Sequence, residues 1–162
     1  MAAVSRVSRL LPSMGKMLRR GLATDTNTEM KFTFACPASV FYNQANVKQV
    51  DVPTFSGTFG ILPQHVPTLA VLKPGVLTVF QQDGNSKRYF VSSGSVTVNE
   101  DSTVQVLAEE AVLVDDLDAS AAQQALQEAQ TQANSGSDVE KAEAQIRVEV
   151  AEAALRAAQG GV

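Results

Sequence analysis

Two periodicities of apolar positions divide the chain into a β region and a helical region. Between residues 30 and 116, short runs rich in Val, Thr, Phe and Tyr alternate with turn residues. The runs at residues 96–98 and 104–106 place Val at every second position, which is the period of a strand with one buried face. The sequences DGNS (83–86) and NEDS (99–102) separate neighbouring runs and predict hairpin turns. About ten such strands predict a β-sandwich or flattened barrel.

A helical composition begins after Asp116. Residues 118–159 are dominated by Ala, Gln and Glu, which are strong helix formers. Asp118 is a suitable N-cap for a first helix that continues to about Ala133, and Asp138 is expected to cap a second helix that ends before Gly160. Because the intervening NSGS sequence is short, the two helices are predicted to form an antiparallel hairpin.

The predicted fold class is therefore β plus α, with a ten-stranded β-sandwich domain at residues 30–116. A C-terminal antiparallel α-helical hairpin domain follows at residues 117–162.

The second predicted helix carries apolar residues on two opposite faces. One face is formed by Val139, Ala142, Ile146, Val150, Ala153 and Ala157, and the other by Ala144, Val148, Ala151 and Leu155. A helix that covered only its own domain would need one such stripe. Two stripes predict two packing partners, namely the first helix and either the sandwich or another chain. The first helix offers mostly alanines, so the contact between the helices is expected to contribute little at about 0.8 kcal/mol per buried methylene.

The amino-terminal segment differs in charge from the rest of the chain. Residues 1–22 contain five of the 13 Lys and Arg residues and no acidic residue. This basic, Ser-containing composition predicts a mitochondrial transit peptide, followed by a flexible linker at residues 23–29. A disordered basic tail that binds nucleic acid or lipid is the alternative. Without this segment, 8 basic residues remain against 17 acidic ones, a charge that argues against nucleic-acid binding.

Few residues in the sequence could carry out chemistry. The chain has one histidine, His65, and one cysteine, Cys36, which do not form a cluster of metal ligands. A Cys36–His65 pair could act as nucleophile and base if the fold joined them, although a free cysteine more often packs as a small apolar residue. The sequence contains neither the GxxxxGKS/T nor the GxGxxG pattern, so no catalytic residue, cofactor or metal site is predicted.

The sequence GTFGILPQHVPTLAVLKPG at residues 57–75 combines glycines, prolines and the histidine. No helix could continue through it, and its prolines fix the backbone before any binding event. Phe59, Ile61 and Leu62 are expected to be exposed on these stiff loops. The segment therefore predicts a binding surface.

This segment resembles a motif of the delta/epsilon subunit family of rotary ATP synthases, named delta in mitochondria and epsilon in bacteria and chloroplasts. Two further blocks, YFVSSGSVTV (89–98) and VQVLAEEA (104–111), resemble strands of the same family. The resemblance extends from about Phe32 to Leu155, and the predicted transit peptide favours the mitochondrial delta branch. It implies the same division into a β-sandwich and a helical hairpin.

The resemblance implies a non-catalytic central-stalk (rotor) subunit of the mitochondrial ATP synthase. Such a subunit links the gamma subunit to the membrane c-ring, couples proton translocation to ATP synthesis and also binds the small mitochondrial epsilon subunit. It would be peripheral to the matrix side of the mitochondrial inner membrane, without a transmembrane segment. The residues implied in contacts with gamma or the c-ring are Ser56, Gly57, Thr58, Phe59, Gly60, Ile61, Leu62 and His65, with Ser56 to Thr58 nearer the ring and His65 nearer gamma.

One departure from the family concerns nucleotide. Some bacterial relatives bind ATP through an Ile/Leu-Asp-x-x-Arg-Ala motif at the start of the first helix, where this chain has LDASAA at residues 117–122. Ala121 stands at the arginine position, so the charged group that would meet phosphate is missing. ATP binding is therefore not expected. A free-standing mitochondrial matrix adaptor or assembly factor, and a small enzyme that uses Cys36 and His65, are the alternative functions.

Overall fold

The computed structural model of the chain describes residues 29–134 and 137–161. The predicted transit peptide at residues 1–22 and the predicted linker up to residue 28 lie outside the described residues. Residues 135–136 of the predicted turn between the helices lie outside them too.

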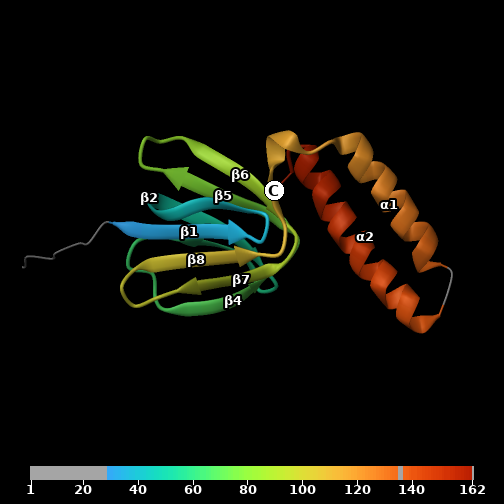
Figure 1. The fold of residues 1–162 in the computed structure, drawn as a ribbon, viewed down its shortest axis with the longest axis horizontal. Coiled ribbons are helices and arrows are strands. Elements are labelled where there is room, and N and C mark those ends of the chain that lie inside the picture. Colours follow the sequence, from blue (N-terminus) through green and yellow to red (C-terminus); the bar gives the residue numbers. More distant parts are fainter. Residues whose placement is uncertain (1–28, 135–136, 162) are drawn as a thin grey trace, which may run out of the picture.

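The described residues form nine strands, one 3₁₀ turn and two helices. The strands are β1 (Met30–Cys36), β2 (Ser39–Thr54), β3 (Gly57–Ile61), β4 (Thr68–Leu72), β5 (Gly75–Gln81), β6 (Ser86–Val91), β7 (Gly94–Val98), β8 (Thr103–Ala108) and β9 (Ala111–Leu113). They are followed by η1 (Val114–Asp116), α1 (Ala119–Ala133) and α2 (Asp138–Ala158). The prediction of a sandwich followed by a helical hairpin is confirmed (Figure 1). The count differs by one, because two runs predicted as separate strands, SVFYN (39–43) and NVKQVDV (46–52), form the single 16-residue strand β2.

Strand β2 connects the two layers of the sandwich. Its first half pairs with β1, and its second half pairs with β5 on one side and β3 on the other. The strand order is β1-β8-β7-β4-β2-β5-β6-β9, with β3 paired to β2 outside this path. The pairing of β1 with β8 is parallel, while the others are antiparallel. The predicted turns at residues 83–86 and 99–102 do connect β5 to β6 and β7 to β8.

The core lies between the layers, and β1, β7 and β8 contribute alternate residues to it. Phe32, Phe34, Val96 and Val106 come from one layer, and Leu77 from the other is likewise fully buried. Three phenylalanines and two tyrosines form a group of aromatic contacts with ring centroids 4.8–6.1 Å apart. Burial of this alternating set explains why the period of two in the sequence predicted the strands correctly.

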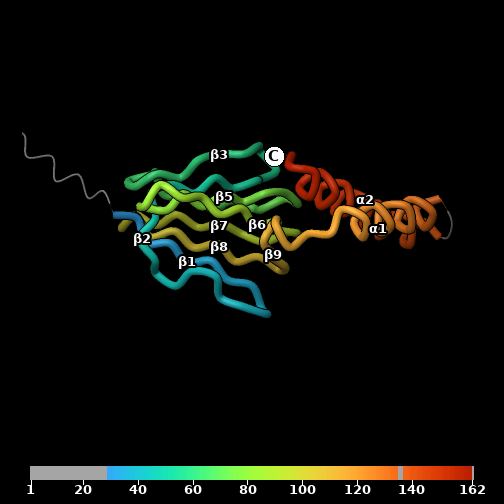
Figure 2. The backbone as a smooth tube through the Cα atoms, turned by 90° about the horizontal axis from the view of Figure 1, so that it is seen from above, coloured from blue at the N-terminus to red at the C-terminus, as the bar shows by residue number. Residues whose placement is uncertain are grey.

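The helical hairpin extends from one end of the sandwich, opposite the end where β1 begins (Figure 2). It is attached through a second, smaller apolar cluster of Val76, Phe90, Val114 and Ala157. Val76 and Phe90 are paired neighbours on β5 and β6, so the helix covers one end of that outer sheet face. A guanidinium nitrogen of Arg88 also donates a hydrogen bond of 2.8 Å to the carbonyl oxygen of Gly161, beyond the end of α2.

The observed caps of the helices agree with those predicted from the sequence, with one exception. Asp118 is the N-cap of α1, as predicted, and its carboxylate accepts hydrogen bonds from the backbone of Ser120 and Ala121. The N-cap of α2 is Ser137 rather than Asp138. The Ser137 hydroxyl accepts from the Glu140 backbone, and the Glu140 carboxylate accepts from the Ser137 backbone, which is a capping box. This reciprocal pair satisfies two backbone donors, whereas Asp138 as N-cap would lack a glutamate at the third helical position.

The two apolar stripes of α2 have different environments. Ala144, Val148 and Ala151 are buried where α2 packs along α1. The other stripe is divided, because its C-terminal members pack on the sandwich while Val139 and Ile146 remain 68% and 64% exposed. The helix α2 thus packs against α1 along one stripe, and the sandwich is its second packing partner only along its last turns.

We expect Ala157→Asp to detach the hairpin from the sandwich. Ala157 has no exposed surface, so the new carboxylate would be buried without a partner, a change that costs several kcal/mol. Ala142→Asp, on the exposed surface of the same helix, is the matched control. Hydrogen exchange should show faster exchange throughout α1 and α2 in the first variant, with strands β1 and β8 unchanged. Equal protection of the helices in both variants would contradict this attachment.

Candidate functional site

The turn between β2 and β3 contains the first three predicted contact residues. Ser56, Gly57 and Thr58 are exposed, and Phe55 beside them is 71% exposed. The Thr54 hydroxyl donates a hydrogen bond of 2.6 Å to the carbonyl oxygen of Gly57 and closes the turn. Gly57 has a φ of 120°, which side chains rarely tolerate, so this position requires glycine.

The segment after β3 folds back so that His65 lies against Phe59. The two rings stack with centroids 5.9 Å apart and planes 25° from parallel. The His65 backbone donates to the carbonyl oxygen of Leu62, and Nδ1 lies 2.9 Å from the carbonyl oxygen of Val66. A carbonyl oxygen can only accept, so this contact is a hydrogen bond when Nδ1 carries the proton. In the neutral ring, Nε2 is then left as an acceptor for a partner.

Gln64 anchors this segment to the β7–β8 turn. It has a φ of 63°, a left-handed conformation unusual for a residue with a side chain. Its backbone N–H donates a hydrogen bond of 3.2 Å to the hydroxyl of Ser102, which is itself buried. The loop is thus held at a defined position against the sandwich rather than standing free of it.

The expectation that Ile61 is exposed is wrong. Ile61 is fully buried in the core, while Phe59, two residues earlier on the same face of β3, is half-buried and packs against the edge of the core. Leu62 lies beyond the strand and is 52% exposed, as expected. Ile61 therefore supports the loop from inside the sandwich, and Phe59 and Leu62 are the apolar residues that a partner could reach.

The predicted contact residues form two groups at opposite ends of β3. Thr58 borders the helical hairpin, where it shares a cavity with Ala157. His65 lies at the other end, close to the β7–β8 turn through its neighbour Gln64. The five residues of β3 span about 15 Å, and His65 reaches back along the strand to stack on Phe59. One partner of moderate size, or two neighbouring partners, could contact both groups.

The structure also shows an apolar surface that the sequence analysis missed. Leu69 and Val71 of β4 and Leu107 of β8 are 76%, 60% and 55% exposed, and we call these three residues the outer apolar face. The strand register places Val71 and Leu107 on either side of Ser95 of β7, in one row. Thr97 and Gln105 lie in the next row with Leu69, so no charged residue interrupts the rows. The continuous apolar run TLAVL (68–72) could have pointed to this surface in the sequence, since such a run indicates a strand that is covered on both faces.

The two residues considered for catalysis are far apart. Cys36 ends β1 near the hairpin, where its sulfur contacts the Ser39 hydroxyl at 3.6 Å, whereas His65 lies beside the opposite end of the sandwich. Burial raises the pKa of the Cys36 thiol, but hydrogen bonds from Ser39, Ala38 and Ala111 outweigh it and lower the pKa below its usual value. Within the described residues, no group of three or more His, Cys, Asp or Glu side chains could hold a metal ion. No helix in this part of the chain is long and apolar enough to cross a membrane.

We expect truncation of Ile61 to lower the free energy of unfolding far more than truncation of Leu62. Ile61→Ala removes fully buried methylenes and should lower the free energy of unfolding by about 2–5 kcal/mol. Leu62→Ala changes an exposed side chain and should alter it by less than about 0.5 kcal/mol. Chemical denaturation of the two variants makes the comparison, and similar losses would mean that the register of β3 is not as described.

Comparisons with known proteins agree with this architecture. Residues 29–114 match the family model described as ATP synthase, Delta/Epsilon chain, beta-sandwich domain. The chain is 52% identical over 130 residues to "ATP synthase subunit delta, mitochondrial" of Caenorhabditis elegans, covering 80% of each chain. It is 40% identical over 139 residues to the protein of the same name from Yarrowia lipolytica, covering 85% of this chain and 86% of that one.

Two solved structures share the fold at low sequence identity. A chain in the Euglena gracilis mitochondrial ATP synthase structure with OSCP, F1 and c-ring matches with a TM-score of 0.76 and 23% identity, covering 96% of this chain and 99% of that one. A chain of the Tetrahymena thermophila mitochondrial ATP synthase central stalk and c-ring structure matches with a TM-score of 0.63 and 17% identity, covering 80% of this chain and 96% of that one. The likeness to these structures concerns the fold, and the sequence matches carry the assignment. The chain belongs to the family of ATP synthase delta/epsilon chains.

Proposed function

We propose that the chain is the non-catalytic central-stalk subunit of the mitochondrial rotary ATP synthase, linking the gamma subunit to the c-ring and coupling proton translocation to ATP synthesis. Family membership supports this role, and the names of the two relatives place them in the mitochondrial enzyme. The observation that carries the proposal is the uncharged outer apolar face beside the rigid loop at Phe59 and His65. A chain that had no partner would expose these side chains to water at a cost.

The gamma subunit is assigned to the outer apolar face and the His65 end of the loop. Leu69, Val71 and Leu107 supply the apolar area, and Phe59, Gly60, Leu62 and His65 supply the edge. This arrangement, an apolar centre with hydrogen-bonding groups around it, is common in protein interfaces. Ser56, Gly57 and Thr58 at the opposite end of β3 are assigned to the c-ring. Ile61 belongs to the interface only as the buried support of the loop.

The exposed stripe of α2 is assigned to the small epsilon subunit. Ile146 borders a groove of about 500 Å³ between the two helices, together with Val150 and the alanines of α1. Small residues let another chain approach the helices closely, and the exposed Ile146 offers apolar area to it. The chain would be held peripherally at the matrix side of the mitochondrial inner membrane through its contact with the c-ring.

The proposed division of the chain is a transit peptide at residues 1–22, a linker at 23–29, the sandwich at 30–116 and the hairpin at 117–162. We expect the mature protein to begin within a few residues of Ala23, because the acid-free composition ends at Asp25. Mass spectrometry of the protein isolated from mitochondria tests this. Recovery of an intact Met1 would contradict it.

Purification of the tagged chain from mitochondria tests the proposed function as a whole. A stalk subunit should co-purify with gamma in equal amounts. A chain that purifies without gamma would instead favour the free-standing matrix adaptor or assembly factor. An enzyme that used Cys36 as a nucleophile would lose its activity in Cys36→Ser, whereas a stalk subunit should assemble normally with that change.

We expect His65→Ala and Leu69→Asp to weaken binding to gamma while leaving the isolated chain folded. His65 loses one neutral hydrogen bond, worth about 0.5–1.5 kcal/mol of binding free energy. Leu69→Asp should cost more, because the new carboxylate would be buried in the contact without a partner. The measurement pairs thermal melting of the isolated variant with its binding to gamma. A lower melting temperature with unchanged gamma binding would show that these residues act in the fold alone.

We also expect no binding of ATP by the isolated chain with a dissociation constant below about 1 mM. Ala121 supplies no charge, and the Asp118 carboxylate is occupied as the helix cap by Ser120 and Ala121. Hydrogen bonds from the Ser120 hydroxyl and from the backbone of both residues hold the pKa of Asp118 below its usual value, so it is an anion beside any phosphate placed there. Titration calorimetry with ATP makes the test, and a saturable isotherm below that concentration would overturn the expectation.

A further inference from the structure

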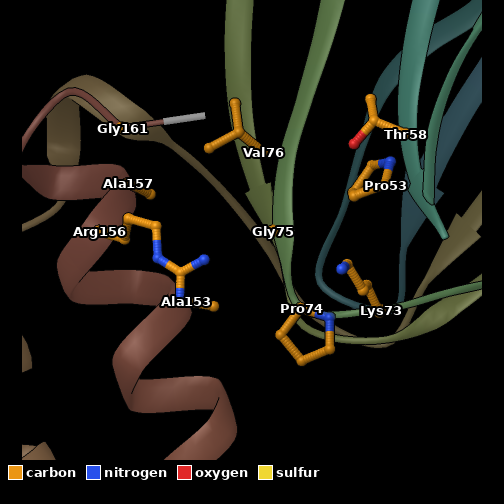
Figure 3. Close-up of a pocket in the computed structure, with 10 residues that line it drawn as sticks. All are labelled: Pro53, Thr58, Lys73, Pro74, Gly75, Val76, Ala153, Arg156, Ala157 and Gly161. Carbon is orange, nitrogen blue, oxygen red and sulfur yellow. The ribbon is translucent and has the colours of Figure 1, made fainter. Parts of the chain in front are cut away.

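A small cavity lies where α2 approaches the sandwich, between the β2–β3 turn and the β4–β5 connection. Its volume is about 90 Å³, and its walls include the side chains of Pro53, Pro74 and Val76 (Figure 3). Three polar side chains line it as well, namely Thr58, Lys73 and Arg156. Lys73 and Arg156 are 83 positions apart in the sequence, so it is the fold that places both cations in the lining of one cavity.

The positive charge at this cavity is not balanced within the described residues. No acidic side chain lines the cavity. Neither Lys73 nor Arg156 has an ion-pair partner in the part of the chain that the structure describes. Arg88 adds a third cation close by, since it donates to the carbonyl oxygen of Gly161, which also lines the cavity. Lys73 is half-buried and Arg156 is exposed, so water screens much of their repulsion. An anion that entered the cavity would meet two cationic side chains in its lining and no acidic one.

The position of Arg156 at the end of a helix does not prevent an anion from approaching it. The C-terminal end of a helix disfavours an anion, because its last carbonyl groups carry partial negative charge. Here the carbonyl oxygens of Leu155, Arg156 and Ala157 accept hydrogen bonds from Gln159, Gly161 and Gly160. Gly161 also packs so closely on Arg156 that a Cβ there would lie 2.7 Å from Cγ of the arginine. The stem of Arg156 therefore lies against Gly161 beside the cavity, while the residue as a whole remains exposed.

We propose that this cavity binds a single phosphate-type oxyanion. The Arg156 guanidinium can donate two parallel hydrogen bonds to such a group, Lys73 provides a point charge and the Thr58 hydroxyl donates a further hydrogen bond. The volume accommodates several waters and thus one tetrahedral anion, but it is below the roughly 300 Å³ of pockets that hold drug-sized ligands. The site therefore takes a phosphate group without a nucleoside, consistent with the absence of ATP binding expected above.

Two sources can supply this chemistry, namely free inorganic phosphate and the headgroup of an anionic phospholipid. The inference goes beyond the proposed stalk function, and it shares with the proposed interface only Thr58. Because the isolated chain suffices to test it, failure of gamma binding and failure of anion binding are separate results.

The first experiment titrates the full chain with inorganic phosphate at constant ionic strength, with chloride as the replaced ion, and follows amide resonances by NMR. We expect saturable shifts concentrated at Gly75, Val76 and Gly161, with a dissociation constant on the order of 1–10 mM. Lys73→Gln and Arg156→Gln should each weaken binding by about tenfold or more, since each removes a charged donor. Lys141→Gln, at an exposed position elsewhere on α2, is the matched control and should bind like the unchanged chain.

The second experiment identifies the source with vesicles of phosphatidylcholine, alone or mixed with phosphatidic acid. Flotation with the mixed vesicles that is lost in Lys73→Gln and Arg156→Gln supports the site and assigns it to a lipid headgroup. Binding of phosphate without flotation supports the site and assigns it to the free ion. The proposal is overturned if neither phosphate nor vesicles bind saturably, or if both cavity variants, checked by melting to be folded, bind as the control does.

Discussion

The pairing of β2 with strands of both layers is the constraint on which the other features depend. One 16-residue strand pairs with β1, β3, β4 and β5, so both layers and the β3 edge are fixed by a single stretch of backbone. The loop that carries His65 continues from β3, and Pro53 near the end of β2 forms a wall of the cationic cavity. A shift of β2 by one residue would exchange Val50 and Val52 with Asp51 in the core. The register of β2 thus determines the core and both candidate surfaces together.

The sandwich and the hairpin are joined far less extensively than the two layers are. The sandwich has a large core with a group of packed aromatic rings, whereas the hairpin is attached through a cluster of four buried residues and the Arg88–Gly161 hydrogen bond. An alanine-rich helix buries little apolar area for each residue, so each member of that cluster matters to the attachment. The cationic cavity lies in this same junction, and an anion bound there would bridge Lys73 of the sandwich to Arg156 of α2.

The sequence was sufficient for the features that depend on local patterns. The period of two in the strands, the turns at 83–86 and 99–102 and the Asp118 cap each depend on residues close together, and the structure contains all of them. Errors arose where the outcome depended on packing across the fold. Ile61 and Phe59 have the same apolar character in sequence and lie on the same face of β3. Only the packing of the other elements around them determines that Ile61 is fully buried while Phe59 stays half-buried. The run TLAVL did not reveal that its outer side would remain uncovered, because that depends on which elements lie over β4.

The two surfaces of the sandwich differ in the physical basis of recognition. The outer apolar face has area but no charge, so it can bind a partner through burial without selecting it by electrostatics. The Phe59–His65 stack and the turn held by Gln64 and Ser102 add directional groups at its edge, which restrict how a partner can be oriented. At the opposite end of β3, the cavity offers positive charge in a space too small for a segment of another protein to enter deeply. Because β3 is rigidly paired to β2 between these sites, a partner at one end is positioned relative to the other by the backbone itself, without any movement of the loop.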